Sequence, residues 1–140
     1  MRIMVIVKAS ERSEAGEMPS AEELNTMGKF NTELVNAGIM LAGDGLRPSK
    51  DGVRITYEGG GKASATDGPF AETKELVAGF WILEVKSLDE AVEWMRRAPF
   101  DPGDTIEIRP FFEVADLADF VTPEELAAPR DGERGKLGVA

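Results

Sequence analysis

Two stretches of the sequence read as strands that are apolar on both faces, and they limit the possible folds more than any other feature. Residues 2–8 are rich in β-branched side chains, and residues 80–85 belong to the most apolar run of the chain. Strands of this kind are buried on both faces and suit the middle of a sheet. We therefore expect these two strands at the centre of a sheet that is covered on both sides.

The first helix is predicted between Ser20 and Gly38. Ser20 and Glu23 have the spacing of a capping box, in which Ser20 caps the helix and Glu23 reaches back to the cap. Gly38 suits the residue that closes the helix. A short second strand is expected at residues 39–42. One apolar stripe at helical spacing should pack on the sheet: Leu24, Met27, Phe30, Leu34 and Val35.

A second helix follows the strand at residues 80–85. Ser87 and Glu90 form another capping box, and Pro99 ends the helix. The last strand is predicted at residues 105–112, where Pro110 indicates an edge or a bulge. The side chains of this helix expected to face inward are Leu88, Ala91, Val92 and Met95.

A hairpin is predicted in the middle of the chain. Residues 53–57 and 62–66 read as its strands, and three glycines at positions 59–61 lie between them. A run of glycines could also indicate a phosphate-binding loop. This one lies between two strands instead of before a helix, and it lacks the lysine and hydroxyl spacing of such loops. The turn is the better interpretation.

The order of these elements indicates an α+β fold of the ferredoxin-like type, βαββαβ, with the hairpin as an insertion. In that fold the first and third strands are central, which agrees with the two doubly apolar strands. We expect residues 1–114 to form this domain. Residues 115–140 should form an acidic C-terminal extension, with a short helix that starts near residues 122–125 and a frayed tail over residues 131–140.

Helices cover only one face of such a sheet, so the composition of the other face is informative. The side chains expected to face the helices are Ile3, Val5, Val7, Trp81, Leu83, Val85, Ile106 and Ile108. Those expected on the opposite face are Met4, Ile6, Phe80, Ile82, Glu84, Glu107, Arg109 and Phe111. The opposite face is too apolar to be left in water, and a two-fold homodimer would cover it most simply. Its charged groups would then form either a structural Arg–Glu network or a pocket for a small polar ligand.

Composition excludes several kinds of chemistry. The chain has no Cys and no His, which removes thiolate nucleophiles, zinc–thiolate sites, imidazole bases and imidazole metal ligands. We expect no bound cofactor and no metal. The net charge of −10 argues against a nucleic acid or an anionic membrane as partner. The apolar run at residues 3–7 is too short for a signal peptide or a membrane span, so a cytoplasmic location is expected.

Residues 67–75, Asp-Gly-Pro-Phe-Ala-Glu-Thr-Lys-Glu, are the most unusual polar stretch. Asp67 and Gly68 favour a turn with positive φ, and Pro69 then fixes the backbone that presents Phe70. The simplest interpretation is a structural corner with Phe70 in the core. The alternative is that Glu72 or Lys74 contacts a ligand.

These nine residues, with residues 79–81, 37–46 and 107–110, resemble the YCII-related family in its DGPF-motif branch. The resemblance covers about residues 1–114. It implies a dimeric α+β barrel, in which two ferredoxin-like subunits pair, within a superfamily that includes isomerases, monooxygenases and haem-binding proteins. It also implies a regulatory role beside an extracytoplasmic-function sigma factor. The histidine of the founding branch's His–Asp pair has no counterpart around residues 25–30, so that chemistry does not carry over.

Three functions follow as alternatives. The first is a homodimer that binds a small polar or anionic molecule between its sheets, with Arg109 as the anchor. The second is an interaction with a transcription-related protein. The third is a histidine-independent isomerase or lyase, with Asp67, Glu72 or Glu107 as its base. The candidate ligand-binding residues are Asp67, Gly68, Pro69, Phe70, Glu72, Lys74, Glu107 and Arg109.

Overall fold

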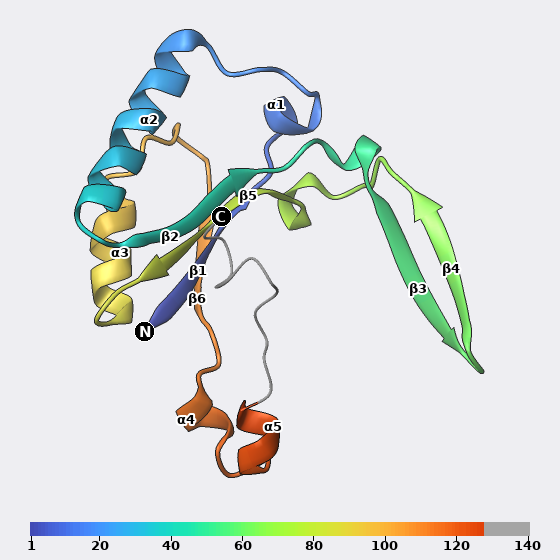
Figure 1. The fold of residues 1–140 in the computed structure, drawn as a ribbon. Coiled ribbons are helices and arrows are strands. Elements are labelled where there is room, and N and C mark those ends of the chain that lie inside the picture. The colour runs from blue at the N-terminus through green and yellow to red at the C-terminus, as the bar shows by residue number, and fades with distance from the viewer. Residues whose placement is uncertain (128–140) are drawn as a thin grey trace.

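A four-stranded antiparallel sheet forms the centre of the computed structural model, which describes residues 1–127 (Figure 1). Its strand order is β2-β5-β1-β6. The strands are β1 (Arg2–Lys8), β2 (Met40–Gly45), β5 (Val77–Glu84) and β6 (Ile106–Pro110). The two doubly apolar strands, β1 and β5, are central and the other two are edges, so the predicted α+β, ferredoxin-like topology is confirmed.

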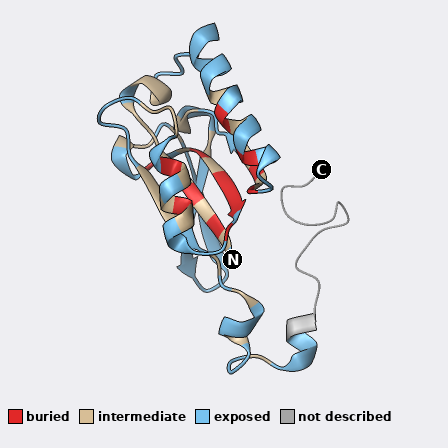
Figure 2. Ribbon diagram, turned by 90° about the vertical axis from the view of Figure 1, so that its left-hand side faces the viewer, coloured by how far each residue is buried: buried red, intermediate tan, exposed pale blue. Residues whose placement is uncertain are grey.

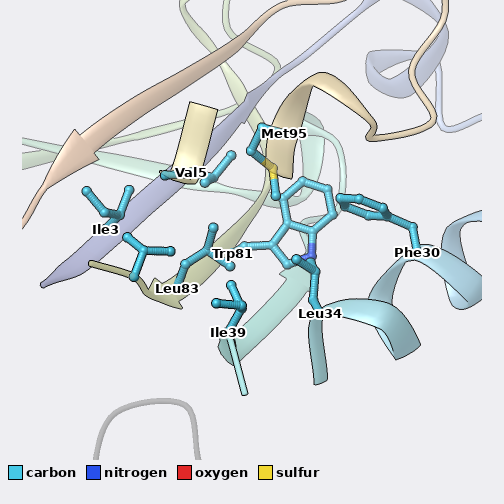
Figure 3. Close-up of a cluster of buried hydrophobic side chains, with 10 residues drawn as sticks. Ile3, Val5, Phe30, Leu34, Ile39, Trp81, Leu83 and Met95 are labelled. Carbon is cyan, nitrogen blue, oxygen red and sulfur yellow. The ribbon is translucent and has the colours of Figure 1, made fainter. Parts of the chain in front are cut away.

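Helices α2 (Ala21–Asn36) and α3 (Leu88–Arg96) cover one face of the sheet (Figures 1 and 2). Ile3, Val5, Leu34 and Leu83 are fully buried between the two layers. Trp81 lies in the middle of this cluster, as Figure 3 shows. Its ring meets those of Phe30 and Phe100 edge to face, with centroids 6.1 and 6.0 Å away. Its indole Nε1 donates a hydrogen bond of 2.9 Å to Asn31 Oδ1.

Each predicted capping box is only half formed. Ser20 and Ser87 accept hydrogen bonds from the backbone N–H of Glu23 and Glu90, as expected. The return bonds are absent, however, because both carboxylates have other partners. Glu23 binds the guanidinium of Arg12, and Glu90 accepts from the backbone N–H of Lys86 instead of from Ser87.

The apolar stripes of the two helices were predicted too wide. Phe30 and Leu34 on α2, and Ala91 and Met95 on α3, are buried as expected. Three of the side chains predicted to face the sheet are instead exposed: Leu24, Val35 and Leu88. The hydrophobic period identifies the side of a helix, whereas the width of contact depends on how closely that helix approaches the sheet.

The predicted hairpin is present as a separate two-stranded sheet of β3 (Val53–Gly59) and β4 (Lys62–Asp67). It extends away from the body of the molecule (Figure 1). Gly59, Gly60 and Gly61 have φ values of 88°, 60° and 76°. Glycine adopts such values without the steric cost of a β-carbon. The turn interpretation of these glycines is therefore confirmed.

Several short helical segments complete the described chain. They are α1 (Glu11–Glu14), η1 (Ser49–Asp51), η2 (Thr73–Glu75), α4 (Val114–Leu117) and α5 (Pro123–Ala127). The α5 segment fits the helix predicted from residue 122, since Thr122 and Glu125 exchange hydrogen bonds between their side chains and backbones. No helix was predicted between β1 and α2, where α1 lies. The frayed tail predicted for residues 131–140 lies outside the described residues.

The sheet face turned away from α2 and α3 has the composition expected from the sequence. Strand register places Met4 between Ile82 and Arg109, and the next row places Ile6 between Phe80 and Glu107. Ile82 is buried, but Met4, Ile6 and Phe80 are only half-buried. An apolar surface therefore remains accessible on this side. Over residues 1–127, no helix is long and apolar enough to cross a membrane.

Candidate functional site

The C-terminal end of β1 is held between two segments that are far away in the sequence. The Lys8 N–H donates to the Thr105 carbonyl at 3.0 Å, and the Ala9 N–H donates to the Leu76 carbonyl at 2.9 Å. Leu76 is buried and fixes the end of η2. These contacts bring η2, the start of α1 and the loop before β6 around the end of one strand.

A cavity of about 930 Å³ opens among these segments. Its size suits a small metabolite. Two of the predicted site residues, Glu72 and Lys74, lie in its wall. The full lining is Lys8, Ala9, Ser10, Glu11, Glu72, Thr73, Lys74, Glu75, Gly103, Asp104 and Thr105. We call it the Lys8–Lys74 cavity.

Glu72 has an unusual backbone conformation in this wall. Its φ and ψ are both 64°, which makes it the one non-glycine residue with positive φ among residues 1–127. The left-handed region costs a residue with a β-carbon about 1–2 kcal/mol. The Glu72 carbonyl accepts from the Glu75 N–H at 2.9 Å and so starts η2. Backbone strain of this kind often accompanies a functional site.

The charges of the cavity are mixed. Two lysine ammonium groups share the lining with four carboxylates and with the hydroxyls of three Ser and Thr residues. Lys8 also connects the cavity to the open sheet face, because its Nζ lies 3.8 Å from Glu107 Oε1. Glu107 Oε2 lies in turn 3.8 Å from a guanidinium nitrogen of Arg109. Glu107 and Arg109 thus form the predicted Arg–Glu pair, loosely, beside the cavity and not in its wall.

The first half of the nine-residue motif lies elsewhere, in a corner packed on η1. The Gly68 N–H donates to the Gly52 carbonyl at 3.0 Å, and the Phe70 N–H donates to Ser49 Oγ at 3.0 Å. Ser49 is itself fixed by Glu14, whose carboxylate accepts from the Ser49 hydroxyl at 2.6 Å and from its N–H at 2.9 Å. Of the motif, only residues 72–75 line the cavity.

Two expectations for this corner are wrong in detail. Gly68 does not have a positive φ; the Gly68–Pro69 peptide bond is cis, and Gly68 is needed because Ser49 lies against it. Phe70 is not a core residue, since it is half-buried beneath the guanidinium of Arg54, which lies 3.9 Å from the ring centroid. Asp67 ends β4 and is exposed.

Sequence reasoning missed several cavity residues. Lys8, Ser10, Asp104 and Thr105 come from separate polar stretches, and only the folded chain brings them together. The available signal was Lys8, a charged residue at the end of an apolar central strand. Glu84, expected near Glu107, lies at the other end of the sheet, opposite Arg2, and binds the N-terminal ammonium at 3.1 Å.

A second cavity, of about 620 Å³, lies beside the first half of α2. Leu24, Met27 and Phe100 contribute apolar surface to it. It shares Lys8 with the first cavity. Its other cation, Arg12, is already engaged, because two guanidinium nitrogens each donate to Glu23 at 3.0 Å. This pairing raises the pKa of Arg12 and lowers that of Glu23. The Lys8–Lys74 cavity is therefore the better candidate for a polar ligand. Within residues 1–127, no three acidic groups converge closely enough to hold a metal ion.

Residues 1–115 match the model of the YCII-related domain, and the chain belongs to this family. An uncharacterized protein of Rhizobium meliloti (strain 1021) is 50% identical over 36 residues, which are 26% of this chain and 29% of that protein. Among solved structures, 5-chloro-2-hydroxyhydroquinone dehydrochlorinase from Burkholderia phenoliruptrix, in complex with 2,5-dihydroxybenzoquinone, is similar with a TM-score of 0.39. The identity is 13%, over 76% of this chain and 91% of that one.

Proposed function

We propose that this YCII-related chain binds a small polar molecule in the Lys8–Lys74 cavity. The observation that supports it best is the position of Glu72, which has a strained left-handed backbone in a cavity wall that also contains the two lysines. If position 72 only linked β4 to η2, glycine could take that φ without any loss of stability or function. We infer that Glu72 keeps its carboxylate there for a ligand.

The lining narrows the class of ligand. Lys8 and Lys74 suit a carboxylate or phosphate group, whereas Glu11, Glu72, Glu75 and Asp104 suit hydroxyl or amine donors. A molecule with both kinds of group, such as an amino acid or a hydroxy acid, fits this lining better than a simple anion does. Lys8 and Lys74 then replace Arg109 as the principal anchors, and Arg109 lies outside the contact set.

Thermal-shift measurements with a panel of amino acids, hydroxy acids and phosphate esters test this proposal. A ligand at a hundred times its Kd stabilises the folded state by about 2.7 kcal/mol. Lys74→Met should abolish the shift and leave the melting temperature of the free protein nearly unchanged. Lys29→Met, on the exposed side of α2, is the matched control. Equal ligand shifts in both variants, or no shift with any compound, would reject the proposal.

Catalysis is a second candidate because one of the three predicted carboxylate bases reaches the cavity. Glu72 lines it, while Asp67 and Glu107 do not. We infer that Glu72 would be the base of any isomerase or lyase activity. Loss of turnover in Glu72→Gln, with ligand binding retained, would separate this role from binding alone.

Three further features remain proposals. Residues 67–75 support membership of the DGPF branch. The apolar sheet face of Met4, Ile6 and Phe80 supports a homodimer. A regulatory role beside an extracytoplasmic-function sigma factor stays a prediction from the resemblance.

A further inference from the structure

The hairpin of residues 53–67, which we call the arm, is exposed along its whole length. Its two strands pack mainly on each other. A two-stranded hairpin without further packing is marginally stable in water. We therefore expect the projecting arm to pack against another surface.

One face of the arm is apolar except at its base, where Asp67 lies opposite Val53. Val53, Ile55 and Tyr57 alternate along β3, and the register places Ala65 opposite Ile55 and Ala63 opposite Tyr57. The exposed fractions of Val53, Ile55 and Tyr57 are 58%, 57% and 82%. The other face is polar, with Arg54, Thr56 and Glu58 on β3 and with Ser64 and Thr66 on β4.

The arm and the open sheet face border the same space. Figure 1 shows α2 and α3 on one side of the sheet and the arm on the other, and Figure 2, viewed from the helix side, agrees. The accessible apolar side chains of the sheet, Met4, Ile6 and Phe80, are on that same side. A partner seated on the sheet would therefore also lie beside the arm.

Two contacts connect the base of the arm to the corner of the nine-residue motif. Arg54 stacks on Phe70 at 3.9 Å, and Gly68 bonds to Gly52 across the two strand ends. The corner formed by the first half of the nine-residue motif thus packs on the base of the arm and lies outside the cavity.

We propose that the arm clasps a second copy of this chain that is seated on the open sheet face, with each arm of the two-fold pair lying against its partner. A second copy supplies both apolar surfaces at once, as an isologous interface requires. The charge of the arm does not oppose this occupant. The arm has two basic residues, Arg54 and Lys62, and two acidic ones, Glu58 and Asp67, so it is neutral within a chain of net charge −10. A neutral arm can approach another acidic copy, and it is unsuited to nucleic acid. This inference does not depend on the ligand.

Sedimentation velocity over a micromolar concentration series tests the clasp. In the double variant Ile55→Thr, Tyr57→Thr, the dimer Kd should rise at least tenfold, because the arm loses its apolar contacts but keeps residues that favour strands. Thr56→Val, on the polar face of the same strand, is the control and should leave Kd within twofold. A stable wild-type monomer, or an unchanged Kd in the double variant, would overturn the proposal.

A second measurement works even where the arm variant alters folding. The chain has no Cys, so Tyr57→Cys provides one unique thiol for a photo-crosslinker. Illumination should give a covalent product of twice 15.2 kDa, with crosslinks to the sheet face of the other copy. The matching Thr56→Cys protein should give much less of this product. Crosslinks confined to the same chain would refute the clasp.

Discussion

Gly68 packs against the backbone of Ser49 so closely that a β-carbon at position 68 would collide with the Ser49 carbonyl oxygen. The same Ser49 donates to Glu14 and accepts from the Phe70 N–H. One serine thus joins α1, η1 and the corner of the nine-residue motif. The corner depends on the absence of a side chain at position 68, and not on an unusual φ.

Gly68→Ala should therefore destabilise the fold. The neighbouring atoms are backbone and cannot move aside as a flexible side chain would, so we expect a loss of about 1–3 kcal/mol, as in overpacked sites. Urea unfolding at neutral pH measures it. Gly28→Ala is the control, because Gly28 lies inside α2 with open space around it. That change should stabilise the protein by up to about 1 kcal/mol. Equal stability of wild type and Gly68→Ala would show that the backbone around Ser49 shifts to accommodate a β-carbon at little cost.

This position shows what sequence can and cannot predict. Asp-Gly-Pro indicates a corner from local backbone preferences alone, and the corner exists. The predicted reason for the glycine, a positive φ, was wrong. The actual reason is close contact with Ser49 of η1, nearly twenty residues earlier in the chain. The sheet order was predictable because the hydrophobic pattern of each strand shows whether it is buried on one face or on both. That pattern can be read without knowing where the neighbouring strands lie in the sequence.

The cavity was only half predictable for the same reason. Glu72 and Lys74 belong to one conspicuous motif, whereas Lys8, Asp104 and Thr105 become its neighbours only through the pairing of β1 with its flanking segments. Arg109 was chosen for its chemistry, yet its side chain is 70% exposed, and its ion-pair partner among residues 1–127 is Glu107, at 3.8 Å. Residue type identifies candidates, and topology decides which of them meet.

Glu72→Gly should separate stability from binding. Removing the β-carbon relieves the left-handed strain at φ 64°, and the greater freedom of the unfolded glycine chain offsets part of that gain. We expect a net stabilisation of about 0.5–1 kcal/mol, measured by urea unfolding. Glu72→Gln, which keeps the strain, should leave stability unchanged. If Glu72 binds the ligand, both variants should lose the ligand response of the Lys8–Lys74 cavity; if it acts only as a base, Glu72→Gln should keep that response. A clear loss of stability in Glu72→Gly would indicate that Glu72 is a structural residue.

Asn31→Ala should weaken the core through Trp81. Asn31 accepts the indole hydrogen bond at 2.9 Å, so the change leaves the Nε1 of a residue that is 5% exposed without this partner. The expected cost is about 1–2 kcal/mol in the free energy of unfolding. Thr32→Ala, one residue later on the exposed side of α2, removes only a bond to the Gly28 carbonyl and should be nearly neutral. Similar values for the two variants would mean that water replaces Asn31 at no cost.

The ion pair between Arg2 and Glu113 should make stability depend on acid pH. Arg2 Nε donates to Glu113 Oε1 at 3.2 Å, and the backbone N–H of Arg2 reaches the same oxygen at 3.3 Å. The hydrogen bond from the Arg2 side chain lowers the pKa of Glu113 below its ordinary value of 4.5. A carboxylate with a lowered pKa in the folded state stabilises that state above pH 4.5. Its contribution is lost as the pH falls through the lowered value.

A double-mutant cycle with Arg2→Met and Glu113→Gln isolates this contribution, since the titration of all other acids cancels. Because both side chains are partly exposed, we expect a coupling of only about 0.5 kcal/mol at pH 7. It should stay constant down to about pH 5.5, decline below pH 4.5 and vanish once Glu113 is fully protonated in both states. Urea unfolding of the four proteins at pH 7, 5, 4 and 3 provides the measurement. A coupling that persists unchanged at pH 3 would show that Arg2 and Glu113 interact through packing and not through charge.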